Sequence, residues 1–282
     1  TLFIISIVIF LVAITSIIVV NHIENDKLSD TYKYIGQAKD INTYIVCLPK
    51  RRKYMQNVVN HFKLNSIFIE PILKDTLNVD KLIRQKLLRS DYKKSEEMAK
   101  KNNPKFQGLN NGRIACHLSH MKTLKTFLQS NNKNCLILED DLEMSNRDDV
   151  INNFVDVVQS LPSDWEYVNL GRCWDYCHKD KPVNKWLVKS QNPLCRHAYL
   201  VSRRGAKKIL DYCLPMKGYA GDMHYTEMVR KGLLNAYSTK IQIFLQNRKQ
   251  FGSNLKNNDE LKTCVVGGYK YLVFGKLKYF KK

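Results

Sequence analysis

Short apolar runs alternate with amphipathic segments along most of the chain after residue 41. Runs of aliphatic and β-branched residues predict buried strands, and apolar residues spaced three or four apart predict helices that cover them. The expected strands are 42–48, 67–72, 135–138, 166–170 and 198–201, and the expected helices are 53–62, 80–88, 112–129, 151–161, 205–213 and 223–231. Strands that alternate with helices in this way indicate an α/β fold with a mostly parallel sheet flanked by helices.

Two segments depart from this alternation. Lys and Asn replace most apolar residues in 89–111, so we expect an irregular surface excursion there. The last segment, 256–282, is basic and aromatic, and Gly267, Gly268 and Gly275 interrupt any helix. It either closes the fold or rests on a membrane surface.

An apolar segment begins at Leu2 and ends at Val20, long enough to cross the ~30 Å hydrocarbon core of a bilayer as a helix. It lacks the small-residue exit that precedes signal-peptide cleavage, which favours an uncleaved signal anchor over a cleaved signal. We therefore expect an anchor over 1–20, a polar stem over 21–41 and a folded domain over 42–255. Such an anchor favours a single-pass membrane protein whose folded domain is lumenal, as in the ER or Golgi.

The charge of the chain is strongly positive, with 46 Lys and Arg against 26 Asp and Glu and a net charge of +20. This surplus indicates an anionic partner, which is nucleic acid, anionic lipid or a phosphorylated small molecule. A basic nucleic-acid-binding module would explain the charge and the Lys-rich segment. It would leave the apolar anchor and the acidic cluster at 139–141 unexplained.

Glu139, Asp140 and Asp141 directly follow the predicted strand 135–138. Adjacent carboxylates repel one another, so local stability does not favour them. Carboxylate oxygens suit a hard divalent cation such as Mn²⁺ or Mg²⁺, and α/β sheets bind ligands at the carboxyl ends of their strands. A solvated acidic turn or a helix cap is the simpler alternative.

Several motifs occur in a fixed order along the chain. They are a strand with a basic turn at 44–52, a helical motif over 112–120 that ends in Ser119 and His120, the acidic motif 136–141, the segments 165–171 and 198–206, and a closing segment with Gln246 and Ser253. Together they resemble glycosyltransferase family 25, which includes bacterial lipooligosaccharide and procollagen galactosyltransferases. The resemblance implies a GT-A fold, which is Rossmann-like, a nucleotide-sugar donor, a divalent metal and inversion at the anomeric carbon. Arg113 and Ala115 depart from the Glu and Gly of many members, and 173–195 is more similar to eukaryotic or viral members.

The resemblance also suggests roles for individual residues. Asp141 is the expected first metal ligand, with Glu139 beside it. A nucleotide-sugar diphosphate is anionic, so basic residues after the first strand suit it, although a solvated basic turn is equally open. The expected donor contacts are Leu48, Pro49, Arg51, Arg52, Ser119, Glu139, Asp140 and Gln246.

An inverting transfer needs a base that deprotonates the acceptor hydroxyl. Asp222, at the start of the helix 223–231, is expected to be this base or to bind the acceptor, with helix capping as the alternative. Glu227 is the reserve candidate. His120 is either an active-site residue or a hydrogen-bonded structural one, and the same alternatives hold for His197.

The cysteines fall into two groups. Cys173, Cys177 and Cys195 bracket a loop, where a disulfide, free thiols or a zinc site with His178 and His197 are the alternatives. Cys47, Cys116 and Cys135 lie in apolar contexts and are expected in the core.

With the resemblance, these patterns predict a metal-dependent glycosyltransferase that moves galactose or glucose from a UDP-sugar. The acceptor is expected to be a glycan, a lipid-linked saccharide or hydroxylysine in a collagen-like protein. No nucleic-acid partner is expected. The alternatives are the nucleic-acid-binding module and a degenerate transferase retained as a lectin or scaffold.

Overall fold

The computed structural model describes residues 41–102, 108–172 and 180–252, together with the backbone of 263–266, 269–272 and 280–281. The chain divides into two compact units, Thr1–Asp40 and Ile41–Lys282. The predicted anchor and nearly all of the predicted stem lie outside the described residues. Among the helices that the structure does describe, none combines the length and the apolar character needed to span a membrane.

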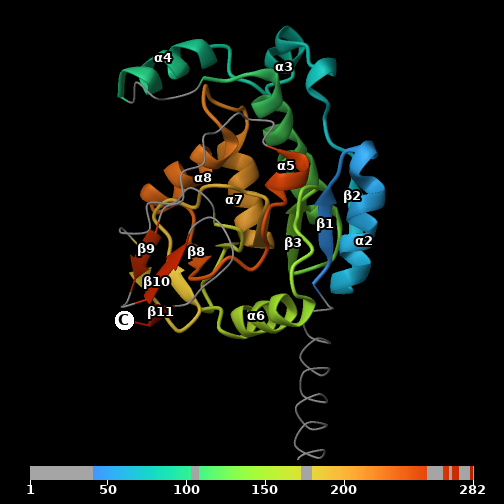
Figure 1. Ribbon diagram of the computed structural model, residues 1–282. Coiled ribbons are helices and arrows are strands. Elements are labelled where there is room, and N and C mark those ends of the chain that lie inside the picture. The colour runs from blue at the N-terminus through green and yellow to red at the C-terminus, as the bar shows by residue number, and fades with distance from the viewer. Residues whose placement is uncertain are drawn as a thin grey trace, which may run out of the picture. The chain divides into compact units, whose positions relative to one another are not determined.

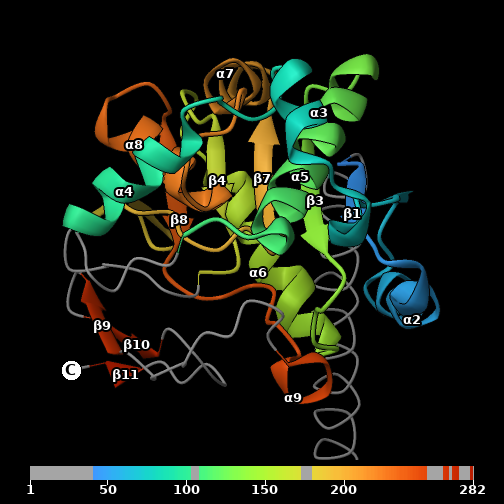
Figure 2. The same cartoon turned by 90° about the horizontal axis from the view of Figure 1, so that it is seen from above.

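A mixed eight-stranded sheet forms the centre of the second unit (Figure 1). Its strands are β1 (Thr43–Val46), β2 (Ser66–Ile69), β3 (Asn134–Glu139), β4 (Tyr167–Asn169), β5 (Lys181–Pro182), β6 (Leu187–Lys189), β7 (Ala198–Ser202) and β8 (Ala236–Thr239). Their order is β2-β1-β3-β7-β4-β8-β6-β5, and Figure 2 shows β3, β7, β4 and β8 side by side. Only β7 and β6 of this sheet run against the common direction. The predicted α/β fold with a mostly parallel sheet is therefore confirmed, and it is Rossmann-like.

Helices flank the sheet and supply the rest of the core. They are α2 (Arg52–Phe62), α3 (Val79–Arg84), α4 (Tyr92–Asn102), α5 (Asn111–Gln129), α6 (Arg147–Gln159), α7 (Arg203–Cys213), α8 (Gly221–Arg230) and α9 (Arg248–Phe251). Helices α5, α7 and α8 contact one another and bury a shared apolar cluster against β3, β4, β7 and β8. Helices α2 and α6 contact each other, and Phe62 and Phe154 both pack edge-on against Phe244, with ring centroids 6.0 Å apart.

The prediction of an irregular segment at 89–111 was wrong for 92–102, where α4 lies. Lys and Glu favour helices, and Glu96 pairs with Lys100 one turn later at 2.7 Å. Tyr92 packs against the small cluster around Leu88 and Met216. One packed aromatic residue and charged residues of high helix propensity are therefore enough to form helix α4, although its apolar periodicity is weak.

The C-terminal segment contributes β9 (Thr263–Val266), β10 (Tyr269–Leu272) and β11 (Phe280–Lys281), which pair antiparallel as a separate sheet in the order β11-β10-β9. Strands here agree with the prediction that glycines prevent a helix. The two roles suggested for the segment remain predictions.

Candidate active site at the carboxyl end of β3

The acidic cluster lies where a strand with a fully buried centre leaves the core. Residues 135–138 of β3 are completely buried, and Glu139 ends the strand. Strand β1 runs parallel to β3 with Val46 opposite Glu139, so the turn after β1 reaches the same edge of the sheet. Two of the predicted motifs are thereby brought together by parallel pairing alone.

Asp140 fixes the turn after β1. Its carboxylate accepts hydrogen bonds from the backbone N–H of Leu48 and from Nη1 of Arg51, both at 2.7 Å. Burial raises the pKa of Asp140, although both donors favour its ionised form. The guanidinium of Arg51 is therefore paired with Asp140. Arg52, by contrast, is exposed, and its Cζ lies 3.5 Å from the centroid of the Phe68 ring.

Asp141 faces a segment that lies far along the chain. Its two carboxylate oxygens accept hydrogen bonds at 3.3 and 3.1 Å from Nε2 of Gln246, which is 105 residues later. The backbone of this segment is held as well, since Asn247 N–H donates to Asp141 O at 2.6 Å. Burial, reinforced by the neighbouring charges of Glu139 and Asp140, raises the pKa of Asp141 to about 7. The structure thus joins Gln246, which was expected only as a donor contact, to the acidic cluster.

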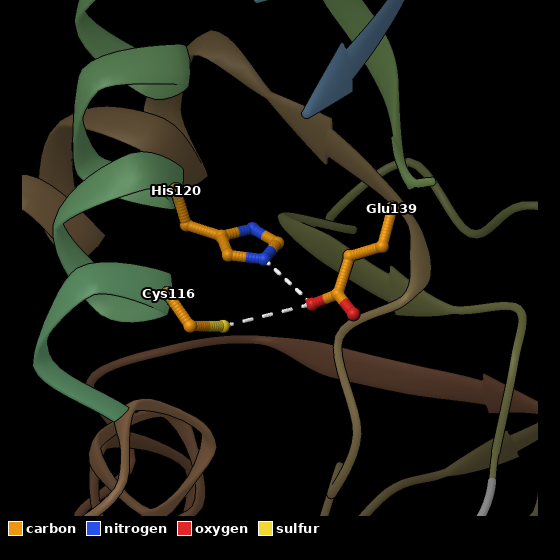
Figure 3. Close-up of side chains that lie close together, drawn as sticks. All are labelled: Cys116, His120 and Glu139. Carbon is orange, nitrogen blue, oxygen red and sulfur yellow. Dashed lines mark hydrogen bonds and ion pairs between the residues drawn. The ribbon is translucent and has the colours of Figure 1, made fainter. Parts of the chain in front are cut away.

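Glu139 points toward His120 and Cys116 of α5 (Figure 3). Its Oε1 lies 2.9 Å from Nε2 of His120 and 3.8 Å from Sγ of Cys116. His120 is completely buried, and its Nδ1 lies 3.0 Å from the hydroxyl of Tyr199. Burial alone would raise the pKa of Glu139, but the hydrogen bond to His120 holds it well below its usual range. His120 is therefore a hydrogen-bonded residue that positions Glu139, and its role in the active site stays a prediction.

Asp222 does not cap its helix. The N-cap of α8 is Ala220, and Oδ2 of Asp222 instead accepts a hydrogen bond at 3.1 Å from the backbone N–H of Cys195. The next residue, Arg196, is buried, and its Nη2 lies 3.9 Å from Sγ of Cys116. Burial would lower the pKa of Arg196, but the nearby groups of Tyr225, Cys116 and Asp222 raise it. The capping alternative is wrong, and Asp222 belongs to a charged group beside Glu139.

Glu227 lies in a different environment on the same helix. Its carboxylate binds the ammonium groups of Lys217 at 2.7 Å and Lys231 at 2.8 Å, and it also accepts from Tyr219. Partial burial opposes ionisation, but these hydrogen bonds lower the pKa of Glu227 to about 2. A carboxylate so strongly held by cations is poorly suited to accept a proton.

Ser119 and His197 both form hydrogen bonds with the backbone near the site. The hydroxyl of Ser119 donates to Ala115 O at 2.7 Å and accepts from Ile72 N–H at 2.8 Å. The backbone oxygen of His197 accepts from Glu139 N–H at 2.8 Å, and its Nε2 lies 3.0 Å from Phe244 O. Both side chains are thus hydrogen-bonded within the protein.

Sequence reasoning missed the roles of Cys116 and Arg196. The expected burial of Cys47 and Cys135 is confirmed, but Cys116 is partly exposed and faces Glu139. The available signal was its spacing from His120, because residues four apart share one face of a helix. Arg196 precedes a fully buried strand, and that position gave no sign that its guanidinium is buried too.

Cys195 is disulfide-bonded, which excludes a free thiol or a zinc ligand at this cysteine. Cys173, Cys177 and His178 lie outside the described residues. The remaining proposed zinc ligand, His197, is directed at a backbone oxygen.

Comparison with known proteins identifies the family. A search of curated proteins finds no significant match to the chain. The model of glycosyltransferase family 25, described as an LPS biosynthesis protein, matches residues 41–225. The match spans β1, the Ser119-His120 helix, the acidic cluster and Asp222, and it covers more than half of the chain. The earlier resemblance is therefore confirmed, and the chain belongs to glycosyltransferase family 25.

Proposed function

We propose that this glycosyltransferase moves galactose or glucose from a UDP-sugar to an acceptor hydroxyl, with inversion at the anomeric carbon. The acceptor would be a glycan, a lipid-linked saccharide or hydroxylysine in a collagen-like protein. The observation that carries the proposal is the carboxylate cluster at the end of β3, enclosed by the turn after β1 and by Gln246. Open α/β sheets bind nucleotides at this edge, and the mixed strand order is compatible with a GT-A fold.

The carboxylates fit a divalent metal. Burial, together with the charges of Glu139 and Asp140, raises the pKa of Asp141 to about 7, so a further negative charge in the cluster is disfavoured. A dication would remove this repulsion, and oxygen ligands suit Mn²⁺ or Mg²⁺. Asp141 and Glu139 would hold the ion, which when bound supplies charge neutralisation at the diphosphate leaving group.

The turn after β1 would hold the donor. Asp140 fixes Leu48 and Arg51, and the intervening Pro49 begins a short 3₁₀ turn, so this backbone is positioned before the donor arrives. Arg52 is exposed next to the same turn and can move to the nucleotide. Because Arg51 is buried against Asp140, its proposed contribution is to position the turn.

Asp222 is the better candidate for the base. Cys195 N–H donates to Oδ2 of Asp222 and so orients this oxygen. The positive charge of Arg196 lies near the negative charge of Asp222. In this position Asp222 would accept the proton of the acceptor hydroxyl as the new glycosidic bond forms. The two lysines that bind Glu227 disfavour the reserve candidate.

The proposal extends to location. The segment 2–20 would anchor the chain in an ER- or Golgi-like membrane with its catalytic domain in the lumen. The disulfide of Cys195 supports an oxidising compartment.

The test is an assay of the full chain in detergent against a panel of nucleotide sugars. Collagen-like hydroxylysine peptides and simple glycans serve as acceptors, each with Mn²⁺ or with chelator. We expect transfer from one UDP-hexose, lost on chelation and in Asp141→Ala but kept in the surface control Asp91→Ala. Turnover of no donor by the folded chain, or turnover unaffected by Asp141→Ala, would refute the proposal.

A further inference from the structure

A second group of potential ligands, with different chemistry, lies next to the carboxylate cluster. Sγ of Cys116, Nε2 of His120 and Oε1 of Glu139 all lie within 4.8 Å of one another. Cys116 and His120 are one turn apart on α5, and Glu139 faces them from the end of β3 (Figure 3). A thiol, an imidazole and a carboxylate converge here, unlike the oxygen ligands around Asp141.

We propose that Cys116, His120 and Glu139 form a zinc site, separate in chemistry from the hard-cation site at Asp141. Typical zinc bond lengths place tetrahedral ligand atoms about 3.3–3.6 Å apart, with the pairs that include sulfur at the upper end. The separations from Oε1 of Glu139, 2.9 Å to His120 and 3.8 Å to Cys116, lie on either side of this range. Small side-chain adjustments therefore suffice to coordinate an ion.

The surroundings of His120 already resemble the outer shell of a metal site. Ligating histidines donate their second ring N–H to a neighbouring group, which orients the ring. Nδ1 of His120 lies 3.0 Å from the Tyr199 hydroxyl, and the two rings stack with centroids 5.7 Å apart. A hydroxyl both donates and accepts, so Tyr199 can accept the Nδ1 proton while Nε2 offers its lone pair to zinc.

The charges balance when zinc is bound. Binding would release the thiol proton of Cys116 to solvent, leaving a thiolate beside the carboxylates of Glu139 and Asp222. Zn²⁺ and the buried guanidinium of Arg196, 3.9 Å from Cys116 Sγ, offset these three negative charges. Binding of Zn²⁺ therefore does not give the site a net positive charge.

Exposure and ligand chemistry select the kind of ion. His120 is buried, whereas Cys116 and Glu139 are partly exposed, so an ion can enter from their side and keep an open fourth position. Thiolate and imidazole favour Zn²⁺ over Mg²⁺ or Mn²⁺. Glu139 contacts both His120 and Cys116 through Oε1, so neither of these contacts uses its other carboxylate oxygen.

The test is a Co²⁺ titration of the full chain in detergent, without oxygen, because Co²⁺ reports thiolate coordination by absorption. We expect a cobalt–thiolate charge-transfer band that saturates at one ion per chain and disappears when Zn²⁺ is added. Cys116→Ala should abolish the band. Cys213→Ala, which removes a buried thiol of α7, should keep it.

Two further variants separate this site from the proposed transferase chemistry. Asp141→Asn should retain the band even if sugar transfer is lost. Glu139→Gln keeps the thiol and should weaken Zn²⁺ binding by at least the ~10–100-fold that outer-shell changes cost. Absence of the band from the wild-type chain, or a band undiminished in Cys116→Ala, overturns the zinc site whatever the transferase assay shows.

Discussion

Asp140→Asn should destabilise the folded domain far more than the same exchange at Asp91. Both aspartates pair with an arginine at 2.7 Å, so the two pairs match in distance and chemistry. They differ in burial, because the side chains of Arg51 and Asp140 are 9% and 11% exposed, whereas those of Arg89 and Asp91 are 43% and 44% exposed. The comparison therefore sets a buried aspartate that also holds the Leu48 N–H against an exposed aspartate that binds its arginine alone.

The magnitude follows from what remains after the exchange. The single amide oxygen of the introduced asparagine cannot serve both donors as a carboxylate does, and the buried guanidinium of Arg51 is left without a countercharge. Removing one partner of a buried pair costs about 3–5 kcal/mol. For a domain of this size, 3 kcal/mol corresponds to a fall in Tm of roughly 6–12 °C. Water and salt screen the exposed pair, so Asp91→Asn should leave Tm unchanged.

Thermal unfolding followed by circular dichroism, with urea unfolding at 25 °C, measures both variants. The double variant Asp140→Asn with Arg51→Met should recover much of the loss, because it removes the stranded charge. Equal falls in Tm for Asp140→Asn and Asp91→Asn would refute the argument that the turn after β1 depends on a buried pair.

Three further outcomes are expected. In chelator, urea unfolding should show that stability falls as pH rises from about 4 through 7, because the folded state retains a proton on Asp141, whose pKa is raised to about 7, that the unfolded chain has already lost. Asp141→Asn should remove this slope, and an unchanged slope would contradict the assignment. Glu227→Gln should be less stable than the wild type at pH 7, with the difference vanishing as pH falls from about 4.5 to about 2, because lysines hold the pKa of Glu227 at about 2. Its rate of sugar transfer should be unchanged, and loss of transfer in a folded variant would return Glu227 to the active site. Gly221→Ala should lower stability by about 1–3 kcal/mol and also slow transfer, because a Cβ there would overlap Nη2 of Arg196. Calorimetry and the transfer assay measure both effects, and a fully active, equally stable variant would show that Arg196 can move without consequence.

Local patterns predicted most elements of the fold. The apolar runs 135–138 and 198–201 are completely buried in β3 and β7, and each predicted helix in the described residues is present. The reversal of β7 between β3 and β4 was not predictable, because strand direction depends on partners that the local pattern does not specify. Helix α4 was missed because charged residues of high helix propensity leave a weak apolar period.

For the site too, local sequence predicted some features and missed others. The position of Asp141 after a buried strand follows from its local sequence. Its contact with Gln246 was not predicted, because the family resemblance suggested Gln246 only as a donor contact. Cys116 was assigned to the core because cysteine in an apolar helix is usually buried. Its contact with Glu139 depends on how α5 packs beside β3, and single-sequence periodicity does not determine that packing.

The central claim is that the carboxylates at the end of β3 bind the donor diphosphate through a divalent metal. The most direct measurement is isothermal titration calorimetry of UDP binding to the full chain in detergent, with Mn²⁺ and then with chelator, repeated for Asp141→Asn. We predict binding to the wild-type chain with Mn²⁺ alone, and a large loss of affinity both in chelator and in the variant. Equal affinity for UDP with and without metal, in wild type and Asp141→Asn alike, would contradict the account.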